Sequence, residues 1–242
     1  MSGRPGIIIA ARATSSRFPG KHFARFGDTT VLGSCIERCL ATGLNVVVAV
    51  PYGQMDDFYG LDISDDECLT NVQDPAWFQP VLYAPSERLN IAENDVLGRV
   101  IACAEEFDID PVIRVTGDCP LVEPAIVLGV LALFLERPTC ELASNVYQGR
   151  TFAKGLDVEV VSLAALKTVH TVGTLEQKEH VTLGIYQQES GQSEEFYIRA
   201  FKNNGHGHHL WPGPDTEPLC VDTPEDLERL NRRFGKGAGN AA

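Results

Sequence analysis

An uninterrupted apolar run near the N-terminus, Gly6-Ile7-Ile8-Ile9-Ala10-Ala11, constrains the fold more than any other segment. A strand that is apolar on both faces is typical of a parallel sheet with helices packed on each side. Further short apolar runs alternate with helical patterns along the rest of the chain. The sequence therefore predicts an α/β fold of three layers with a mostly parallel, mixed sheet.

The apolar periodicity places the individual elements. It predicts strands at residues 6–11, 44–50, 81–84, 111–116, 156–161 and 196–201. It predicts helices at residues 31–41, 94–107 with Asn94 as N-cap, 124–135, around 175–188, and from an N-cap at Thr223. Residues 55–80 show no clear pattern. With 242 residues, the chain is expected to form a single domain over residues 1–234 and a flexible tail at 235–242.

Charge and cysteine usage exclude several classes of protein. The 20 basic and 33 acidic residues give a net charge of −13, which disfavours binding to nucleic acids or anionic membranes. No apolar stretch is long enough for a signal sequence or a membrane span. The 7 cysteines include no CxxC pair, so we expect reduced thiols in a cytoplasmic protein.

A cationic loop follows the first predicted strand. Residues 1–27 contain five basic side chains and no acid, and the loop itself reads AARATSSRFPGK from Ala10 to Lys21. Ligands of open α/β sheets bind beyond the carboxyl ends of the strands, where small residues expose backbone N–H groups to anions. The pattern is neither a P-loop nor GxGxxG. The loop predicts phosphate binding, although a solvated basic loop is the alternative.

Two acidic motifs accompany this loop. Asp118 follows the predicted strand 111–116 in the run VTGDCP, and Asp222 precedes the last predicted helix in VDTPEDL. Asp118 beside a triphosphate would suit Mg²⁺, which prefers carboxylate and phosphate oxygens. Both aspartates are also common in turns, so each motif alone leaves that interpretation open.

These blocks together resemble the cytidylyltransferases that make CMP-activated acidic sugars, a family that includes the 3-deoxy-manno-octulosonate (Kdo) and acylneuraminate enzymes. The loop AARATSSRFPGK is similar to the signature of that family. The closest resemblance is to the spore-coat polysaccharide branch, through ENDVLGRV, RVTGDCPLVEP, ASN, GLDVEVVS, KEHVT and VDTPEDLE in family order. The resemblance spans nearly the whole chain and implies a Rossmann-like nucleotidyltransferase fold.

The resemblance also implies roles for individual residues. The nucleotide-binding positions are Ala10, Ala11, Arg12, Ser15, Ser16, Arg17, Lys21 and Asp95. The metal ligands are Asp118 and Asp222, and the catalytic residues are Arg17, Lys21 and Asp118. The acceptor side is lined by Asp157, Glu159, Glu179 and His180, where Glu179 and His180 are alternatively an exposed pair on a helix. Nearby Arg150 and Lys154 are candidate cations for an acidic acceptor.

One segment departs from the family pattern. Residues 202–218 include His206, His208 and His209, whose spacing fits a loop better than a metal site. This departure leaves the acceptor open. A contact around residues 145–185 would form the homodimer that the resemblance suggests.

The expected function is Mg²⁺-dependent transfer of CMP from CTP to a sugar, or a sugar-like acidic acceptor, with release of pyrophosphate. The alternatives are a sugar-phosphate nucleotidyltransferase that uses UTP or GTP, and a catalytically silent nucleotide-binding protein. No covalent enzyme intermediate is expected, because no cysteine or histidine lies in a recognisable nucleophile motif.

Overall fold

A computed structural model describes residues 3–58, 80–188, 196–203 and 211–235. Within these ranges the main sheet has seven strands in the order β5-β4-β1-β6-β8-β7-β9. Their bounds are β1 (Arg4–Ala10), β4 (Asn45–Ala49), β5 (Val81–Tyr83), β6 (Ile109–Thr116), β7 (Leu142–Ser144), β8 (Glu159–Val161) and β9 (Ile198–Ala200). Only β8 among them runs antiparallel to its neighbours, β6 and β7. The prediction of a mixed, mostly parallel sheet is confirmed.

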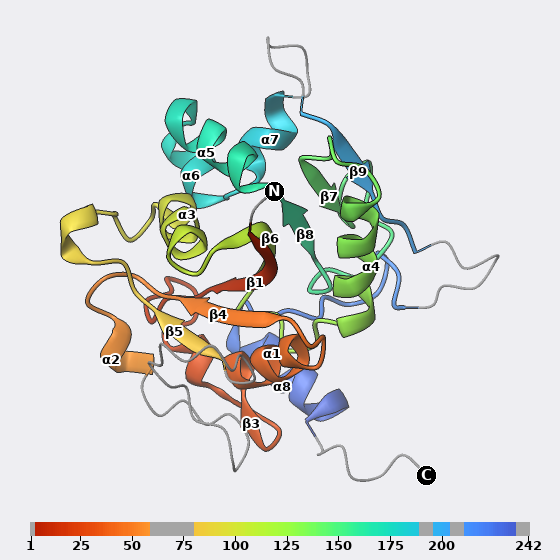
Figure 1. Ribbon diagram of the computed structural model, residues 1–242. Helices are drawn as coiled ribbons and strands as arrows, with labels where there is room; N and C mark the ends of the chain where they lie inside the picture. Colours follow the sequence, from red (N-terminus) through yellow and green to blue (C-terminus); the bar gives the residue numbers. More distant parts are fainter. Residues whose placement is uncertain (1–2, 59–79, 189–195, 204–210, 236–242) are drawn as a thin grey trace.

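Helices cover both faces of this sheet (Figure 1). One layer contains α1 (Val31–Leu40), α4 (Pro124–Leu135) and α8 (Pro224–Phe234). The other contains α3 (Val96–Glu106), α5 (Leu163–Val172), α6 (Leu175–Glu179) and α7 (Leu183–Gln188). In β1, Ile7 and Ile9 face the first layer and Ile8 faces the second, and all three are fully buried. This is why the strand sequence is apolar without alternation.

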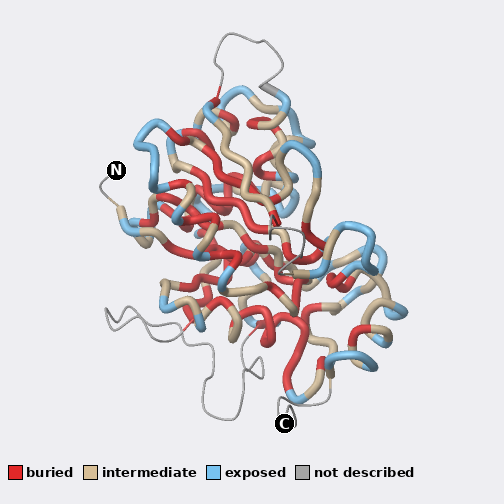
Figure 2. Tube along the Cα trace, turned by 90° about the vertical axis from the view of Figure 1, so that its right-hand side faces the viewer, coloured by how far each residue is buried: buried red, intermediate tan, exposed pale blue. Residues whose placement is uncertain are grey.

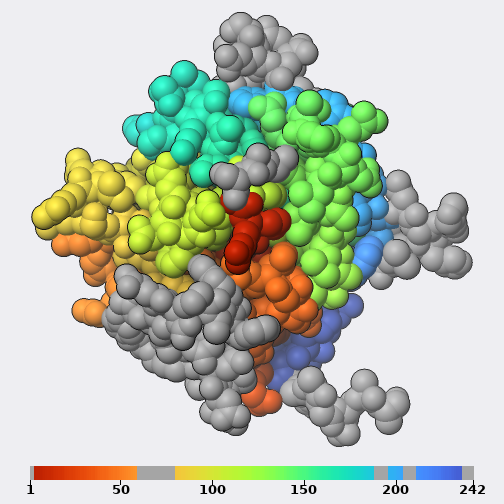
Figure 3. All heavy atoms as spheres, viewed as in Figure 1, coloured from red at the N-terminus to blue at the C-terminus, as the bar shows by residue number. Residues whose placement is uncertain are grey.

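The buried chain is concentrated in the central strands and in the helix faces that pack on them (Figure 2). The start of β1 emerges between α3 and α4 on the face shown in Figure 3. At the other end of the strand, Ala10 lies beside the carboxyl end of β6, where it pairs with Thr116. The predicted phosphate loop, which runs from Ala10 to Lys21, and the turn with Asp118 therefore begin at the ends of adjacent strands.

Short elements complete the described structure. They are the 3₁₀ helices η1 (Lys21–Phe23) and η2 (Glu87–Leu89), the two-stranded β2 (Arg25–Phe26) and β3 (Thr29–Thr30), and α2 (Met55–Phe58). Residues 59–79, within the segment that the sequence left unassigned, lie outside the described residues. So do His206, His208 and His209, and all of the predicted tail except Gly235.

The structure corrects several details of the sequence prediction. Asp95, not Asn94, caps α3, because its Oδ1 accepts a 2.8 Å hydrogen bond from the Gly98 N–H. The helix predicted around 175–188 is two helices, interrupted where Val181 has a φ of 51°. The strand predicted at 156–161 is shorter, and β7 and α5 were not predicted.

The described helices are too short or too polar for any of them to cross a membrane.

Candidate active site

A cavity of about 260 Å³ opens at the carboxyl ends of β1 and β6. Most of the predicted site residues line it: Ala10, Ala11, Arg12, Ser15, Ser16, Arg17, Lys21, Asp118, Glu179 and His180. The loop after β1, the turn after β6 and the end of α6 thus share one cavity. Asp95, Asp157, Glu159 and Asp222 are absent from its lining.

Lys21 links the phosphate loop to both predicted metal ligands. Its Nζ lies 2.5 Å from Asp118 Oδ2 and 3.9 Å from Asp222 Oδ1. It also donates to the Val221 carbonyl oxygen at 3.2 Å. The preceding residue, Gly20, has a φ of 71°, a left-handed conformation that glycine adopts without strain. This turn starts η1 and directs Lys21 inward, so that its side chain is only 11% exposed.

The two aspartates are brought together by the backbone as well. The Val221 N–H donates to the Asp118 carbonyl oxygen at 2.8 Å. Asp222 Oδ1 also accepts a hydrogen bond from Arg17 Nη2 at 2.8 Å, and its Oδ2 accepts one from Lys154 Nζ at 2.9 Å. Asp118 and Asp222 therefore lie on one side of the molecule, in the same cationic environment.

Asp118 is ionised at neutral pH. Burial alone would raise the pKa of its carboxyl, but the charge and hydrogen bond of Lys21 outweigh burial and lower it. Two negatively charged carboxylates that share a lysine are also suitable ligands for a divalent cation. The described residues contain no cluster of three or more His, Cys, Asp or Glu side chains arranged for a metal. A cation held here would thus need further oxygen ligands from a bound phosphate or from water.

His22 is a site residue that the sequence prediction missed. It is 5% exposed, lines the cavity and contacts the Arg12 carbonyl oxygen through Nδ1 at 2.8 Å. Burial lowers the pKa of the imidazole to about 4, so it is neutral at pH 7 and Nδ1–H is the donor. A Cβ on Gly117 would lie 3.2 Å from His22 Nε2, so glycine permits this packing.

The predicted acceptor side divides into two parts. Glu179 lies in the cavity with Oε1 3.8 Å from Arg12 Nη2, and exposed His180 follows it. Buried Glu159 instead accepts hydrogen bonds from Arg114, Thr182 and Tyr186. Both carboxylate oxygens of Asp157 bind the guanidinium of Arg150. Contacts of these acids with an acceptor stay predictions.

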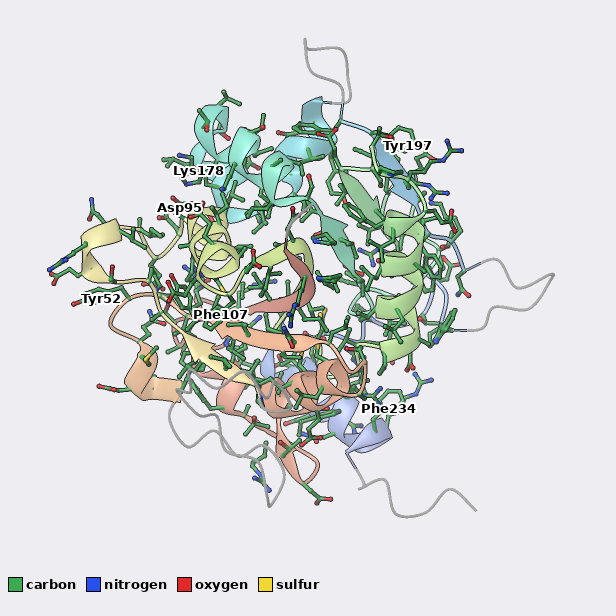
Figure 4. All side chains as sticks on the ribbon, viewed as in Figure 1. Tyr52, Asp95, Phe107, Lys178, Tyr197 and Phe234 are labelled. Carbon is green, nitrogen blue, oxygen red and sulfur yellow. The ribbon has the colours of Figure 1, made fainter. Side chains whose placement is uncertain are left out.

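Asp95 has a structural role in the described chain. Its Oδ2 lies 2.9 Å from His170 Nε2, while Oδ1 caps α3. Figure 4 shows Asp95 near α3 and α5. Its predicted approach to the nucleotide therefore stays a prediction that requires these contacts to change.

Two arginines in the cavity lining, Arg99 and Arg114, were also missed. Each was visible in the sequence as a charged residue inside an apolar element, Arg99 in VLGRVIAC and Arg114 in PVIRVT. A charge in a buried segment is a functional signal, because burial of an ion is costly unless it is paired. Candidate cations Arg150 and Lys154, in contrast, pair with Asp157 and Asp222 outside the cavity lining.

No protein-family model matches the chain. It is 25% identical over 266 residues to a 3-deoxy-manno-octulosonate cytidylyltransferase of Solibacter usitatus, covering 96% of this chain and 97% of that protein. It is 32% identical over 139 residues to an 8-amino-3,8-dideoxy-manno-octulosonate cytidylyltransferase of Shewanella oneidensis, covering 54% and 48%. A 3-deoxy-manno-octulosonate cytidylyltransferase of Alcanivorax borkumensis is 25% identical and is also covered over 48% of its length. The chain thus spans about half the length of the last two relatives.

Solved structures agree with the fold. A cytidylyltransferase from Leptospira borgpetersenii superposes with a TM-score of 0.71 at 28% identity, covering 96% of this chain and 88% of that one. A CMP:2-keto-3-deoxy-manno-octonic acid synthetase, solved in complex with CTP, gives a TM-score of 0.63 at 17% identity, with coverage of 96% and 98%. The second likeness concerns the fold alone. The predicted nucleotidyltransferase fold is confirmed, and the relation to the spore-coat branch stays a prediction.

Proposed function

Because this chain belongs to the cytidylyltransferases that make CMP-activated sugars, we propose that it transfers CMP from CTP to a sugar or sugar-like acidic acceptor and releases pyrophosphate. The observation that carries the proposal is the position of Lys21. It joins Asp118 to the loop from Ala10 to Lys21 and approaches Asp222, and it lines a cavity together with other cationic side chains.

The proposed reaction needs positioning and charge neutralisation more than covalent help from the protein. A hydroxyl oxygen of the acceptor attacks the α-phosphorus of CTP, and the bond from that phosphorus to the bridging oxygen of the β-phosphate breaks. Pyrophosphate leaves with the bonding electrons, and the hydroxyl proton passes to solvent. Arg17 and Lys21 are placed to stabilise the negative charge that develops on pyrophosphate.

We further propose that Asp118 and Asp222 bind Mg²⁺ together with phosphate oxygens of CTP. Their convergence on Lys21 supports this assignment, because a nucleotide in the cavity would add the oxygen ligands that two carboxylates lack. When bound, Mg²⁺ would neutralise phosphate charge and lower the pKa of the acceptor hydroxyl. In that state Lys21, Arg17 and Lys154 would be released to contact phosphate oxygens.

The remaining roles follow from position. The backbone at Ala10 and Ala11, with Arg12, Ser15 and Ser16, would hold the triphosphate. Glu179 and His180 face the same cavity and would contact the acceptor. A homodimer with contacts around residues 145–185 also stays part of the proposal.

The decisive experiment is pyrophosphate release by the full chain with CTP, UTP, GTP and ATP, each with Mg²⁺ and a panel of acceptors. The panel contains 3-deoxy-manno-octulosonate, its 8-amino-3,8-dideoxy analogue and neutral sugars. We expect release with CTP in preference to the other nucleotides. Release only with UTP or GTP would show instead that the protein is a nucleotidyltransferase that uses a nucleotide with another base. CTP binding without release across the whole panel would indicate a silent nucleotide-binding protein.

A further inference from the structure

Arg99 is almost completely enclosed by protein and yet lacks an acidic partner. It lies in α3, is 1% exposed and lines the cavity described above. Among the described residues, its only side-chain hydrogen bond runs from Nη1 to the Glu93 carbonyl oxygen at 3.0 Å. Its Nε is buried and has no partner there. An arginine in this state is unusual, because buried charges are normally paired.

Arg114, which also lines the cavity, resembles Arg99 in having an Nε with no partner among the described residues but differs in having an acidic partner. It lies in β6, and its Nη1 donates to Glu159 Oε2 at 2.6 Å. Glu159 is held by Thr182 Oγ1 at 2.8 Å and by the Tyr186 hydroxyl at 2.6 Å, so the position of Nη1 is fixed. The Nε of Arg114 is again buried, with no hydrogen-bond partner in the described structure.

In both arginines the same edge of the guanidinium lacks a hydrogen-bond acceptor among the described residues. In each, Nη1 is used, while no described residue accepts a hydrogen bond from Nε or Nη2. The Nε and Nη2 hydrogens point in the same direction and match the two oxygens of a carboxylate or phosphate. An unsatisfied buried N–H is costly, so a ligand that fills this edge recovers that cost.

The acids near Arg99 are already committed to other contacts. Glu93 accepts a hydrogen bond from the Thr14 hydroxyl, and Asp95 binds the Gly98 N–H and His170. Burial, and next the charge of Arg12, lower the pKa of Arg99 to about 10, so it remains charged at neutral pH. Arg17 and Lys21 differ, because each already contacts a carboxylate.

We propose that Arg99 and Arg114 form an oxyanion-binding subsite in this cavity, which binds a carboxylate or phosphate group of a substrate through the Nε–Nη2 edges. The inference rests on the proposed function, because that function supplies the two substrates that could carry the anion. One source is a phosphate of CTP, and the other is an acid group of the acceptor. The subsite is therefore a specificity determinant of the proposed reaction.

The test measures binding, independently of turnover. Dissociation constants for inorganic phosphate, CTP and 3-deoxy-manno-octulosonate are determined by calorimetry, without a second substrate, for the wild type and for Arg99→Met, Arg99→Lys and Arg114→Lys. Loss of a charge-assisted bidentate contact should weaken at least one probe about tenfold or more in all three variants. The lysine variants keep the charge and lose the planar edge, so they separate this geometry from simple attraction.

The probe that weakens identifies the source of the anion. Weaker CTP binding assigns the subsite to the nucleotide, and weaker binding of the octulosonate alone assigns it to the acceptor. Arg38→Met is the control, because Arg38 pairs with Glu123 outside this cavity and its loss should leave all three constants unchanged. Arg99→Met should also unfold, without ligand, at the same temperature as the wild type or a higher one, since it removes an unpaired buried cation.

The inference is overturned if no probe weakens in a variant that remains folded, or if the wild type binds none of the probes. Each result is distinct from failure of the proposed function, which appears as absent pyrophosphate release in the wild type. If the wild type binds CTP through Arg99 but does not release pyrophosphate, the subsite is supported and the proposed enzymatic activity is refuted.

Discussion

The Lys21 ammonium donates a 2.5 Å hydrogen bond to Asp118 Oδ2, although the two residues belong to loops after different strands. The contact forms because β1 and β6 are parallel neighbours, which places both loops at one edge of the sheet. The Lys21 side chain is 11% exposed and that of Asp118 is 23% exposed, so the pair is shielded from most screening by solvent. It couples the phosphate loop to the predicted metal site.

Replacement of Lys21 by alanine should lower turnover with CTP about a hundredfold or more. This is the typical effect of losing one group that stabilises charge in the transition state. The measurement is the rate of pyrophosphate release at saturating CTP. Lys167→Ala, which removes a half-exposed lysine paired with Glu105 on the surface, is the matched control and should keep the wild-type rate. Wild-type turnover in Lys21→Ala would remove this residue from the mechanism.

Asp118→Asn should raise the Mg²⁺ concentration that gives half-maximal activity at least about tenfold. The amide keeps the shape of the side chain but loses the negative charge that pairs with Lys21 and that, in the proposed function, binds the cation. A titration of activity against Mg²⁺ checks this. Glu136→Gln removes an exposed acid that pairs with Arg199 outside the cavity lining, so its Mg²⁺ curve should match the wild type. An unchanged curve for Asp118→Asn would exclude it as a ligand.

The elements that sequence reasoning located are those with strong local signals. The continuous apolar run predicted β1, and the Thr223-Pro224 start with early acids predicted α8, where a capping box of Thr223 and Asp226 forms. The location of the site at the carboxyl ends of the strands then followed from the topology, because parallel strands have their carboxyl ends on the same side of the sheet. For this reason the loop from Ala10 to Lys21 and Asp118 line one cavity.

Other features depend on contacts that no local pattern encodes. His22 looks like a surface residue of a polar loop, but it is buried beside Phe58 and Gly117. Asp95 rather than Asn94 caps α3, since the choice depends on which side chain reaches the Gly98 N–H. At the break between α6 and α7, Val181 adopts a left-handed backbone conformation, which tertiary packing imposes against the local preference of a β-branched residue.

Gly155→Ala should destabilise the protein by about 2 kcal/mol or more. Gly155 has a φ of 98°, and a Cβ there would lie 2.5 Å from the Leu219 carbonyl carbon and 2.6 Å from the Cys220 nitrogen. These are backbone atoms of the segment that carries Asp222, so they must move apart. The free energy of unfolding in urea measures the effect.

The matched control for this prediction is Gly149→Ala. Gly149 has a φ of 88° but open space around the site of a Cβ, so only the conformational cost of about 1 kcal/mol applies. Equal destabilisation of the two variants would mean that the close approach of Gly155 to the Leu219–Cys220 backbone has no energetic importance.

His22→Asn should remove part of the pH dependence of stability. In the wild type the pKa of His22 is lowered to about 4 by burial, whereas in the unfolded chain it is 6.5. As the pH falls from about 6.5 to about 4, the unfolded state binds a proton that the folded state does not, so stability decreases. Between pH 7.5 and pH 5.0 this contributes a loss of about 2 kcal/mol.

Urea unfolding at these two pH values tests the prediction. Asparagine keeps a side-chain N–H for the Arg12 carbonyl oxygen but does not titrate, so His22→Asn should lose less stability than the wild type on acidification, by about 2 kcal/mol. His180→Asn, which removes an exposed imidazole from the same cavity, should keep the wild-type difference. The same difference in His22→Asn as in the wild type would show that His22 is not held neutral by burial, and that another group causes the acid sensitivity.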